Sequence, residues 1–211
     1  MISNFMNVLV LAPHTDDGEL GAGGTIAKLI ESGSKVTYVA FSTASKSIPD
    51  GLPKDILKTE VRAATKELGI KPENLIIHNY EVRKLGYHRQ SILEDLVTLR
   101  SSRHFDLVLT PSLQDIHQDH ATIAHESLRA FKNVTILGYE LIWNNLSFDT
   151  KCFVELERQH LDLKHTALQH YTSQAHREYL SKNFTFSLAK TRGVQAGCRY
   201  AECFEVIRLF L

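Results

Sequence analysis

Two short segments of the chain are dense in side chains that bind metals or move protons. The first is Pro13-His14-Thr15-Asp16-Asp17, and the second, much later, is Asp115-Ile116-His117-Gln118-Asp119-His120. Each directly follows an apolar run that is typical of a buried strand. Because the carboxyl ends of parallel strands meet at one edge of an open sheet, where ligand sites collect, we expect the two segments to meet over one metal ion.

In the first segment, the spacing of His14 and Asp17 allows an imidazole and a carboxylate to converge on one ion where the chain turns from strand to helix. Asp16 should point differently. A carboxylate that lies beside a metal without binding it can take a proton from metal-bound water. Alternatively, Asp16 and Asp17 cap the next helix, a common role of Asp at a helix start. The preceding His14 favours the metal site.

A glycine-rich stretch, 18–25, follows the acidic pair. Such a turn between strand and helix can bind phosphate, so a nucleotide-binding module without catalysis is an alternative function. The stretch has no G-x-G-x-x-G in register with the strand and no G-K-[ST], and the acidic pair stands where a phosphate would need free N–H groups. We therefore expect the glycines to allow close packing of backbone near the site.

The second segment places His117 and His120 three residues apart at the expected entry to a helix. Residues at this spacing share a helix face, so one histidine could complete the metal site while the other faces the substrate. Asp119 or Asp115 could accept a hydrogen bond from a histidine ring, which fixes its tautomer and raises its basicity. The alternative is a polar helix start with Asp119 as a cap. The density of histidine and aspartate favours the metal site.

The elements that would position these segments alternate between strand and helix patterns over the first two-thirds of the chain. This order predicts an α/β fold, with a mostly parallel sheet covered by helices on both faces in three layers. Strands are expected at 7–12, 35–42, 74–78, 106–110 and 134–138, and helices at 20–32, 54–68, 88–103 and 121–131.

After about Tyr139 this rhythm breaks. A strand is expected at 152–156, a helix at 161–170 and a final strand at 200–211 on the edge of the sheet. The sequence contains no evident repeat or linker, so residues 1–211 are expected to form a single domain.

The composition narrows the class of protein. The chain has 211 residues, 43% of them hydrophobic, which suits one domain with a sizeable core. Lys plus Arg and Asp plus Glu are balanced at 24 each, which gives no electrostatic argument for nucleic acid or an anionic membrane. No apolar stretch approaches the roughly 20 residues of a membrane span. Without an evident signal peptide, and with three cysteines in no metal spacing, a soluble cytoplasmic protein is expected.

The motifs resemble those of a known family. P-H-T-D-D with a downstream glycine-rich turn, followed by D-x-H-x-D-H, is similar to the paired motifs of the PIG-L/LmbE family of zinc-dependent N-acetylglucosaminyl deacetylases. The usual first motif of that family is [AP]-H-P-D-D-E. Here Thr15 replaces the proline and Gly18 the glutamate, with Glu19 one place later. The resemblance continues through 60–70, 88–93, 171–174 and 200–204, and so covers nearly the whole chain.

This resemblance implies a Rossmann-like sandwich and a zinc ion bound by His14, Asp17 and His120, whereas spacing alone leaves the choice of histidine open. It implies Asp16 as the general base and His117 as the acid or oxyanion stabiliser. The implied substrate is a small amino sugar or glycoconjugate, which loses its N-acetyl group. Family members often form trimers or hexamers, so a homo-oligomer is expected.

Residues that contact the substrate are expected around this edge of the sheet. Four basic residues, Lys58, Arg62, Arg83 and Arg89, could hydrogen-bond sugar hydroxyls or a phosphate, and we select Arg62 and Arg89. For each of them the simpler explanation is a solvated side chain.

Segments that follow strands could form the walls of the site. Tyr139, Glu140 and Trp143 follow the fifth strand, and Trp143 in particular could stack on a sugar or merely pack. The loop 43–53 should lie at the rim. A different metal-dependent amidohydrolase on the same scaffold, acting on another acyl group or a non-sugar amide, is an alternative because pocket shape decides the acyl group. A divalent metal other than zinc is also compatible with these ligands.

Overall fold

Within residues 2–48 and 51–210, which are described by a computed structural model, seven strands form one sheet. The strands are β1 (Asn7–His14), β2 (Lys35–Ser42), β3 (Leu75–Ile77), β4 (Leu107–Pro111), β5 (Thr135–Tyr139), β6 (Cys152–Glu155) and β7 (Ala201–Arg208). Their order across the sheet is β3-β2-β1-β4-β5-β7-β6. The first five strands pair in parallel, and β7 runs antiparallel to both β5 and β6.

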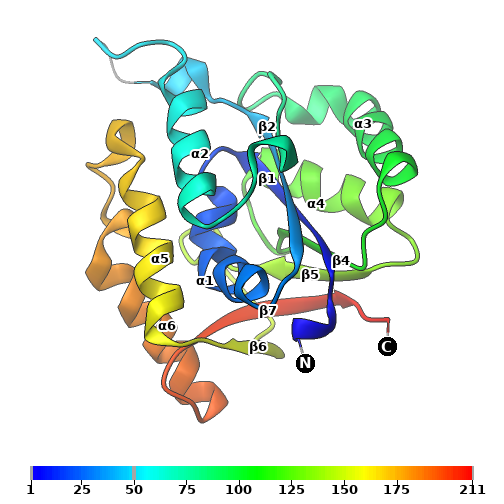
Figure 1. The fold of residues 1–211 in the computed structure, drawn as a ribbon. Coiled ribbons are helices and arrows are strands. Elements are labelled where there is room, and N and C mark those ends of the chain that lie inside the picture. The colour runs from blue at the N-terminus through cyan, green and yellow to red at the C-terminus, as the bar shows by residue number, and fades with distance from the viewer. Residues whose placement is uncertain (1, 49–50, 211) are drawn as a thin grey trace.

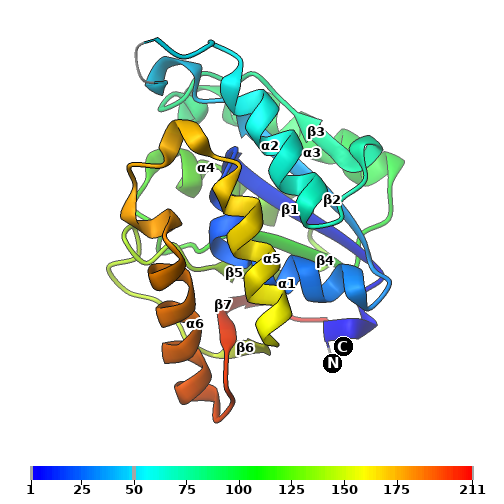
Figure 2. The same ribbon diagram turned by 60° about the vertical axis from the view of Figure 1, so that its left-hand side comes forward.

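Helices cover both faces of this sheet (Figure 1). The helices are α1 (Asp17–Glu31), α2 (Ile56–Glu67), α3 (Arg89–Ser102), α4 (Gln118–Ala130), α5 (Arg158–Gln169) and α6 (Lys182–Ala196). Residues of α1, α2, α5 and α6 share one apolar cluster with the sheet, and residues of α3 and α4 share another. The turned view shows α5 lying beside α1 and α2 (Figure 2). The expected three-layer α/β sandwich is therefore confirmed.

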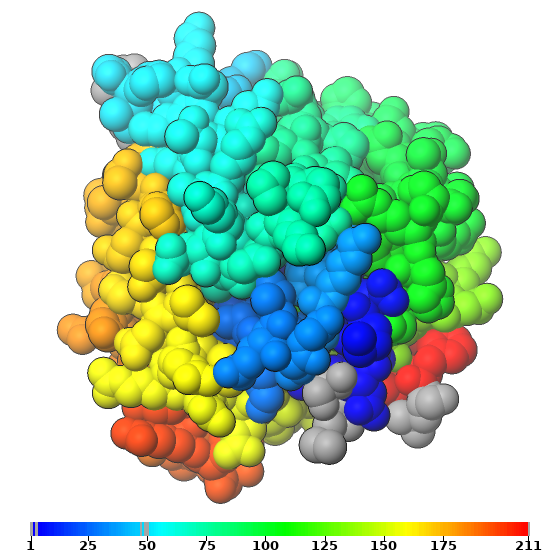
Figure 3. All heavy atoms as spheres, viewed as in Figure 1, coloured from blue at the N-terminus to red at the C-terminus, as the bar shows by residue number. Residues whose placement is uncertain are grey.

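The central strands are buried on both faces because their side chains alternate between the two clusters. In β1, Val8 and Val10 pack into the layer of α1, whereas Leu9 and Leu11 pack into the layer of α3 and α4. All four are fully buried. A nearly continuous apolar run is what a parallel strand covered on both sides requires. Side chains of α2 and α5 lie side by side on the outer surface of the α1 layer (Figure 3).

The last third of the chain differs from the sequence expectation in two ways. The final strand, β7, lies between β5 and β6 and not at the edge, where β6 lies instead. Helix α6 was not expected, because its buried positions, Thr185, Ala189 and Gly193, are small and give no apolar stripe. It starts at Ser181, whose hydroxyl accepts a hydrogen bond from the Phe184 N–H at 3.1 Å.

The topology brings the two motifs together. β1 pairs directly with β4. The strands that follow β1 in sequence, β2 and β3, lie on one side of it, and β4 and all later strands lie on the other side. Ligands of open α/β sheets bind at the carboxyl ends of the strands at such a switch point. The first motif begins with the last two residues of β1, Pro13 and His14, and the second follows β4, so both lie at this edge. Among the described residues, no helix is long and apolar enough to cross a membrane.

Candidate metal centre

Three side chains from the two motifs converge at the carboxyl ends of β1 and β4. Oδ2 of Asp17 lies 3.1 Å from Nδ1 of His14 and 3.2 Å from Nε2 of His120, and these two nitrogens lie 3.2 Å apart. Donors around a tetrahedral zinc ion, with bonds of about 2.0–2.2 Å, would lie about 3.3–3.6 Å apart. The three donors therefore fit a small divalent cation after only a slight expansion. We call Asp17 Oδ2, His14 Nδ1 and His120 Nε2 the donor triangle.

The other ring nitrogen of each histidine contacts a carboxylate. Nδ1 of His120 lies 2.7 Å from Oδ2 of Asp115, and Nε2 of His14 lies 3.0 Å from Oδ2 of Asp119. The fully buried Asp119 also accepts backbone hydrogen bonds from Arg83 at 2.6 Å and Leu85 at 3.2 Å. A carboxylate that takes the outer N–H of a histidine leaves the inner nitrogen free for a metal.

The protonation of this cluster is set by its aspartates. Burial alone would lower the pKa of both histidines. Asp17 and Asp119 nevertheless raise the pKa of His14 to about 9, and Asp17 and Asp115 raise that of His120 to about 10. Burial opposes ionisation of Asp17, but the two histidines hold its pKa well below the usual range. The carboxylates thus keep the histidines protonated until a metal replaces the protons.

His117 lies against the triangle and faces the adjoining cavity. Its Nδ1 accepts the backbone N–H of Asp119 at 3.2 Å, so that it caps α4. A neutral ring in this position carries its proton on Nε2. Burial, and then the nearby His120 and His14, lower the pKa of His117 to about 4. At neutral pH His117 is therefore an uncharged N–H donor.

His117 could also be considered as a metal ligand. Nitrogens of His14, His117 and His120 lie within 4.8 Å of one another. The carboxylate of Asp17 is nearer, because its Oδ2 lies within 3.2 Å of both other donors. We therefore assign Asp17 to the triangle and leave His117 outside it.

Asp16 lines the cavity beside the triangle. It stands at the N-cap position of α1, but its side chain makes no capping hydrogen bond. It lines the cavity instead and is partly buried. Burial, followed by the charge of Asp17, raises its pKa to about 6. A carboxylate that is free of a cap and faces a cavity is suited to proton transfer.

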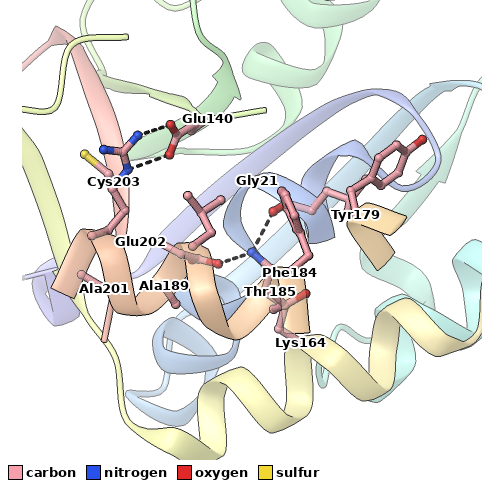
Figure 4. Close-up of a pocket in the computed structure, with 13 residues that line it drawn as sticks. Gly21, Glu140, Lys164, Tyr179, Phe184, Thr185, Ala189, Ala201, Glu202 and Cys203 are labelled. Carbon is pink, nitrogen blue, oxygen red and sulfur yellow. Dashed lines mark hydrogen bonds and ion pairs between the residues drawn. The ribbon is translucent and has the colours of Figure 1, made fainter. Parts of the chain in front are cut away.

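The glycine-rich stretch of α1 binds a protein carboxylate. The helix is interrupted at Ala22, whose backbone is not helical (φ −141°, ψ 15°). After this break, the N–H groups of Gly24 and Thr25 donate to Glu202 at 3.0 and 2.7 Å. Nζ of Lys164 donates to Glu202 and to the carbonyl of Leu20, both at 2.7 Å (Figure 4).

This arrangement explains the glycines and argues against the nucleotide-binding alternative. Glu202 takes the two N–H groups at which a phosphate would have to bind. A Cβ atom at Gly21 would lie 2.3 Å from the ring of Tyr139, and one at Gly24 would lie 2.5 Å from Cδ1 of Leu156. The expected role of the glycines in close packing is therefore confirmed at these two positions.

A second buried cluster lies beneath the turn that carries the first motif. The carboxyl group of Glu19 is fully buried and bonds to the hydroxyl groups of Tyr38 and Tyr171. The same hydroxyls lie 2.9 and 2.7 Å from the carbonyl of Thr15. A Cβ atom at Gly18 would lie 2.6 Å from Oη of Tyr38, so the Tyr38 ring requires glycine there. Burial raises the pKa of Glu19 to about 8.

A cavity of about 300 Å³ opens beside the triangle. Asp16, Asp17 and the histidines of both motifs form its floor. Trp143 lines it, as the sequence suggested, and its ring stacks on Tyr179 with ring centres 4.1 Å apart. Other walls come from the start of α2 and from connecting segments that sequence reasoning assigned only in part: Ala44, Leu57, Val82, Arg83, Asn144, Gln174, Arg177 and Tyr179.

Several residues proposed as substrate contacts lie elsewhere. Arg62 is exposed and lines a separate hollow beside α2, and Nε of Arg89 lies 2.6 Å from the buried Glu126. The hydroxyl of Tyr139 donates to the carbonyl of Leu11, and Glu140 pairs with Arg192 (Figure 4). The register of their helices and of β5 turns these side chains away from the cavity, which spacing alone did not reveal.

Three of the cavity residues that the sequence missed are in the segment 171–180. Gln174, Arg177 and Tyr179 all line the cavity. This loop follows the point at which the alternation of strands and helices breaks, so no strand end predicted its place. The similarity of Tyr171-Thr172-Ser173-Gln174 to the family pattern was the one available signal.

Known deacetylases are similar to this chain in sequence. A sequence model described as PIG-L, GlcNAc-PI de-N-acetylase, matches residues 9–131. The uncharacterised deacetylase YaiS of Escherichia coli K12 is 26% identical over 174 residues, which are 79% of this chain and 90% of YaiS. Diacetylchitobiose deacetylase of Thermococcus kodakarensis is 29% identical over 137 residues, 62% of this chain and 50% of that protein.

The fold also has a close counterpart among solved structures. The N,N'-diacetylchitobiose deacetylase of Pyrococcus horikoshii, in complex with an inhibitor, superimposes with a TM-score of 0.81 at 22% identity. The superposition covers 98% of this chain and 85% of that one. The two chains therefore share the same fold over nearly all of the present sequence.

Proposed function

The chain belongs to the PIG-L family of N-deacetylases, and from this premise we propose that it removes the acetyl group from an N-acetylglucosamine-type amino sugar with the help of a bound zinc ion. The observation that carries the proposal is the triangle of His14, Asp17 and His120, with donors 3.1–3.2 Å apart, beside a cavity that also contains Asp16. His14, Asp17 and His120 would hold the metal. When bound, zinc would polarise the amide carbonyl and lower the pKa of a water from 15.7 to about 7.

Asp16 is proposed as the general base. Its carboxylate faces the cavity, is free of a capping hydrogen bond and is adjacent to Asp17 in the chain. A base with a pKa near 6 is ionised at neutral pH and accepts a proton from the attacking water. The same carboxyl group can then carry that proton towards the leaving amine, which leaves poorly without one.

His117 is proposed to stabilise the oxyanion. Because its Nδ1 accepts the Asp119 N–H, the proton of the neutral ring is on Nε2, which can donate to an oxygen in the cavity. A fixed N–H donor aimed at a developing oxyanion contributes to catalysis without reorganisation during the reaction. We favour this role over that of a charged acid, because burial and the nearby histidines lower the pKa of His117 to about 4.

The sugar is proposed to lie on the wall formed by Trp143 and Tyr179. Their stacked rings give a flat apolar surface next to polar groups, Asn144 and Gln174, that can bond to hydroxyls. The related enzyme of Thermococcus kodakarensis is described as acting on diacetylchitobiose. An N-acetylated amino sugar is therefore the first substrate class to test.

The proposal is tested by amine release from a panel of substrates. The panel contains N-acetylglucosamine, its 1-phosphate, nucleotide-linked and thiol-conjugated forms, and diacetylchitobiose, and each is assayed with zinc-loaded and with chelated protein. Metal-dependent amine release from any member supports the proposal. If the zinc-loaded protein releases amine from none of them, but from an N-formyl or non-sugar amide, the alternative of another amidohydrolase holds instead.

We also predict a single domain over residues 1–211, a cytoplasmic location and a trimer or hexamer. Limited proteolysis, fractionation and light scattering test these three predictions in turn. The identity of the metal is testable by comparing zinc with iron and cobalt, since a site of two histidines and one aspartate binds several divalent ions.

A further inference from the structure

The turn between His14 and Asp17 carries the proposed base, Asp16, without giving its side chain a hydrogen-bond partner. Among the described residues, the Asp16 carboxylate makes no hydrogen bond to another residue. By contrast, Oδ2 of Asp17 accepts the backbone N–H of His14 at 2.8 Å and contacts both rings of the donor triangle. The direction of the Asp16 side chain therefore depends on how its backbone is held.

The peptide bond that precedes Asp16 is held by two tyrosine hydroxyls. Oη of Tyr38 lies 2.9 Å from the carbonyl oxygen of Thr15, and Oη of Tyr171 lies 2.7 Å from it. All three residues are buried. Because a peptide bond is planar, the direction of this carbonyl fixes the plane that contains the N–H and Cα of Asp16. The two hydroxyls thus fix the point from which the Asp16 side chain starts.

Glu19 holds both hydroxyls from the first turn of α1. One of its carboxyl oxygens bonds to the hydroxyl of Tyr38, and the other lies 2.8 Å from that of Tyr171. The backbone N–H of Gly18 also donates to Oη of Tyr38 at 3.2 Å. A hydroxyl hydrogen rotates to suit its partners, so these bonds orient the two tyrosines. Glu19 does not line the cavity, and any effect it has on the reaction must pass through these bonds.

The same cluster joins the turn to a wall of the cavity. Tyr38 comes from β2, whereas Tyr171 begins the segment 171–180, which lines the cavity. This segment has a separate anchor on α2. The backbone N–H and the hydroxyl of Ser173 donate to the carboxylate of Glu60 at 2.9 and 2.6 Å. Loss of the Tyr171 hydroxyl should therefore loosen the turn while the wall stays in place.

We propose that Glu19, Tyr38 and Tyr171 are positioning residues, which act through the Thr15 carbonyl to aim the carboxylate of Asp16 at the attacking water. This inference rests on the proposed function. A catalytic group that is displaced by about 1 Å can lose about 10²-fold in rate, so a base without its own hydrogen bond needs such support.

The proposal also explains why this chain departs from the usual family motif. A Cβ atom at position 18 would lie 2.6 Å from Oη of Tyr38, so the glutamate of the usual motif cannot stand there. Gly18 leaves room for the tyrosine, and Glu19, one place later, bonds to its hydroxyl. Gly18, Glu19 and Tyr38 thus form a matched set.

The first test is Tyr171→Phe, which keeps the buried ring and removes only the hydroxyl. We expect kcat for the most active substrate of the panel to fall about 10- to 100-fold. KM should change by less than about twofold, because an interaction that serves the transition state alone leaves ground-state binding intact. Zinc affinity should be retained, since Asp119 and Asp115 still hold the two histidines. Tyr38→Phe should give the same result.

Further variants separate hydrogen bonding from packing. Glu19→Gln keeps a donor and an acceptor for the hydroxyls and should retain most of kcat, whereas Glu19→Met keeps the bulk alone and should lose as much as Tyr171→Phe. The matched control is Tyr139→Phe, which removes another buried hydroxyl. That hydroxyl donates to the carbonyl of Leu11 at 2.9 Å, within β1 and not in the turn, so kcat should be unchanged.

Three results would overturn the proposal while the deacetylase function stands: an unchanged kcat in Tyr171→Phe, an equal loss in Tyr139→Phe, or a loss of kcat that is matched by a loss of zinc. If no substrate releases amine, the proposed function is wrong, and ¹⁵N relaxation of the Asp16 amide still tests the positioning. The order parameter of this amide should be about 0.85 in the wild type and lower in Tyr171→Phe. Equal values in the two proteins contradict the proposal.

Discussion

At the scale of residues, the centre of the site follows from where the polar motifs stand relative to buried strands. A histidine and an aspartate three residues apart after β1 could be predicted to converge, and the structure brings His14 and Asp17 to 3.1 Å. The pairing of the outer carboxylates could not be predicted. Asp119 holds His14 across the sheet, whereas Asp115 holds His120 within its own segment. Such pairing depends on strand order and not on spacing.

The first residue-scale prediction concerns Asp16. Because Asp16 makes no capping bond and stands outside the donor triangle, Asp16→Asn should lower kcat about 10²- to 10⁴-fold while zinc remains bound. Zinc content and amine release are measured on the same preparation. The control is Asp149→Asn, whose exposed side chain pairs with the exposed Lys151. Near-full activity of Asp16→Asn would falsify the assignment of the base.

The protonation of His14 and His120 in the metal-free protein predicts how zinc affinity depends on pH. The folded-state pKa of His14 and of His120, about 9 and about 10, lies above the ordinary value of 6.5. Protonation therefore stabilises the metal-free protein fully below pH 6.5, and this contribution is lost as the pH rises through 9 to 10. Zinc must displace these protons, so zinc affinity should increase with pH over this range.

Calorimetry measures this directly. Zinc titrations at pH 7 in buffers of different ionisation enthalpy should give heats that differ between buffers, because at least about one proton is released per zinc. In His120→Ala the released number should fall. Heats that are independent of the buffer would mean that the histidines are already neutral in the metal-free protein.

At the scale of elements, the alternation of strands and helices was predictable through β5 because each element there has a clear apolar period. After β5, the expected strand, helix and strand are present as β6, α5 and β7. Helix α6 and the place of β7 in the sheet were not predicted, because α6 buries small residues and β7 lies between β5 and β6. These elements still matter to the site. β7 supplies Glu202, and the loop before α6 supplies Arg177 and Tyr179.

The prediction for elements concerns the break in α1. Lys164 and Glu202, each with a side chain 7% exposed, hold the two halves of α1 by binding the Leu20 carbonyl and the N–H groups of Gly24 and Thr25. Removing one partner of a buried ion pair leaves an uncompensated charge. Lys164→Met should therefore lower the free energy of unfolding by about 3–5 kcal/mol in urea titrations.

A double-mutant cycle completes this experiment. The double variant Lys164→Met, Glu202→Gln should lower the free energy of unfolding by less than the sum of the two single changes. In each single variant one buried charge loses its partner, whereas in the double variant no unpaired charge remains. The control Lys151→Met breaks an exposed pair and should change stability by less than about 0.5 kcal/mol. Additive single and double effects would show that the two residues do not act as a pair.

At the scale of the whole molecule, the site is assembled from both layers and from distant parts of the chain. The donor triangle comes from segments after β1 and β4, which the parallel topology makes adjacent. The cavity walls come from loops between elements, such as those that carry Arg83, Trp143 and Arg177. The centre of the site could therefore be predicted from motifs and strand order. Of the walls, Trp143 and the loop that carries Ala44 could be predicted. The other wall residues could not, because loop geometry has no periodic signal.

Since the donors come from separate segments, a bound metal should stabilise the whole fold. A ligand at 100 times its Kd that binds only the folded state adds about 2.7 kcal/mol to the free energy of unfolding. For a chain of this size, we expect chelation to lower Tm by about 5–10 °C. His120→Ala should abolish this difference. An equal Tm with and without chelator in the wild type would indicate that the triangle does not bind the metal.

The catalytic metal centre is best tested by a zinc titration of chelated protein with amine release followed in parallel. The substrate is whichever N-acetylglucosamine compound of the panel is most active. We expect activity to be absent after chelation, to rise with bound zinc and to saturate at about one zinc per chain, as a single site of three protein ligands requires. Activity that persists without zinc, or saturating zinc without amine release, would contradict the assignment of His14, Asp17 and His120 to a catalytic metal centre.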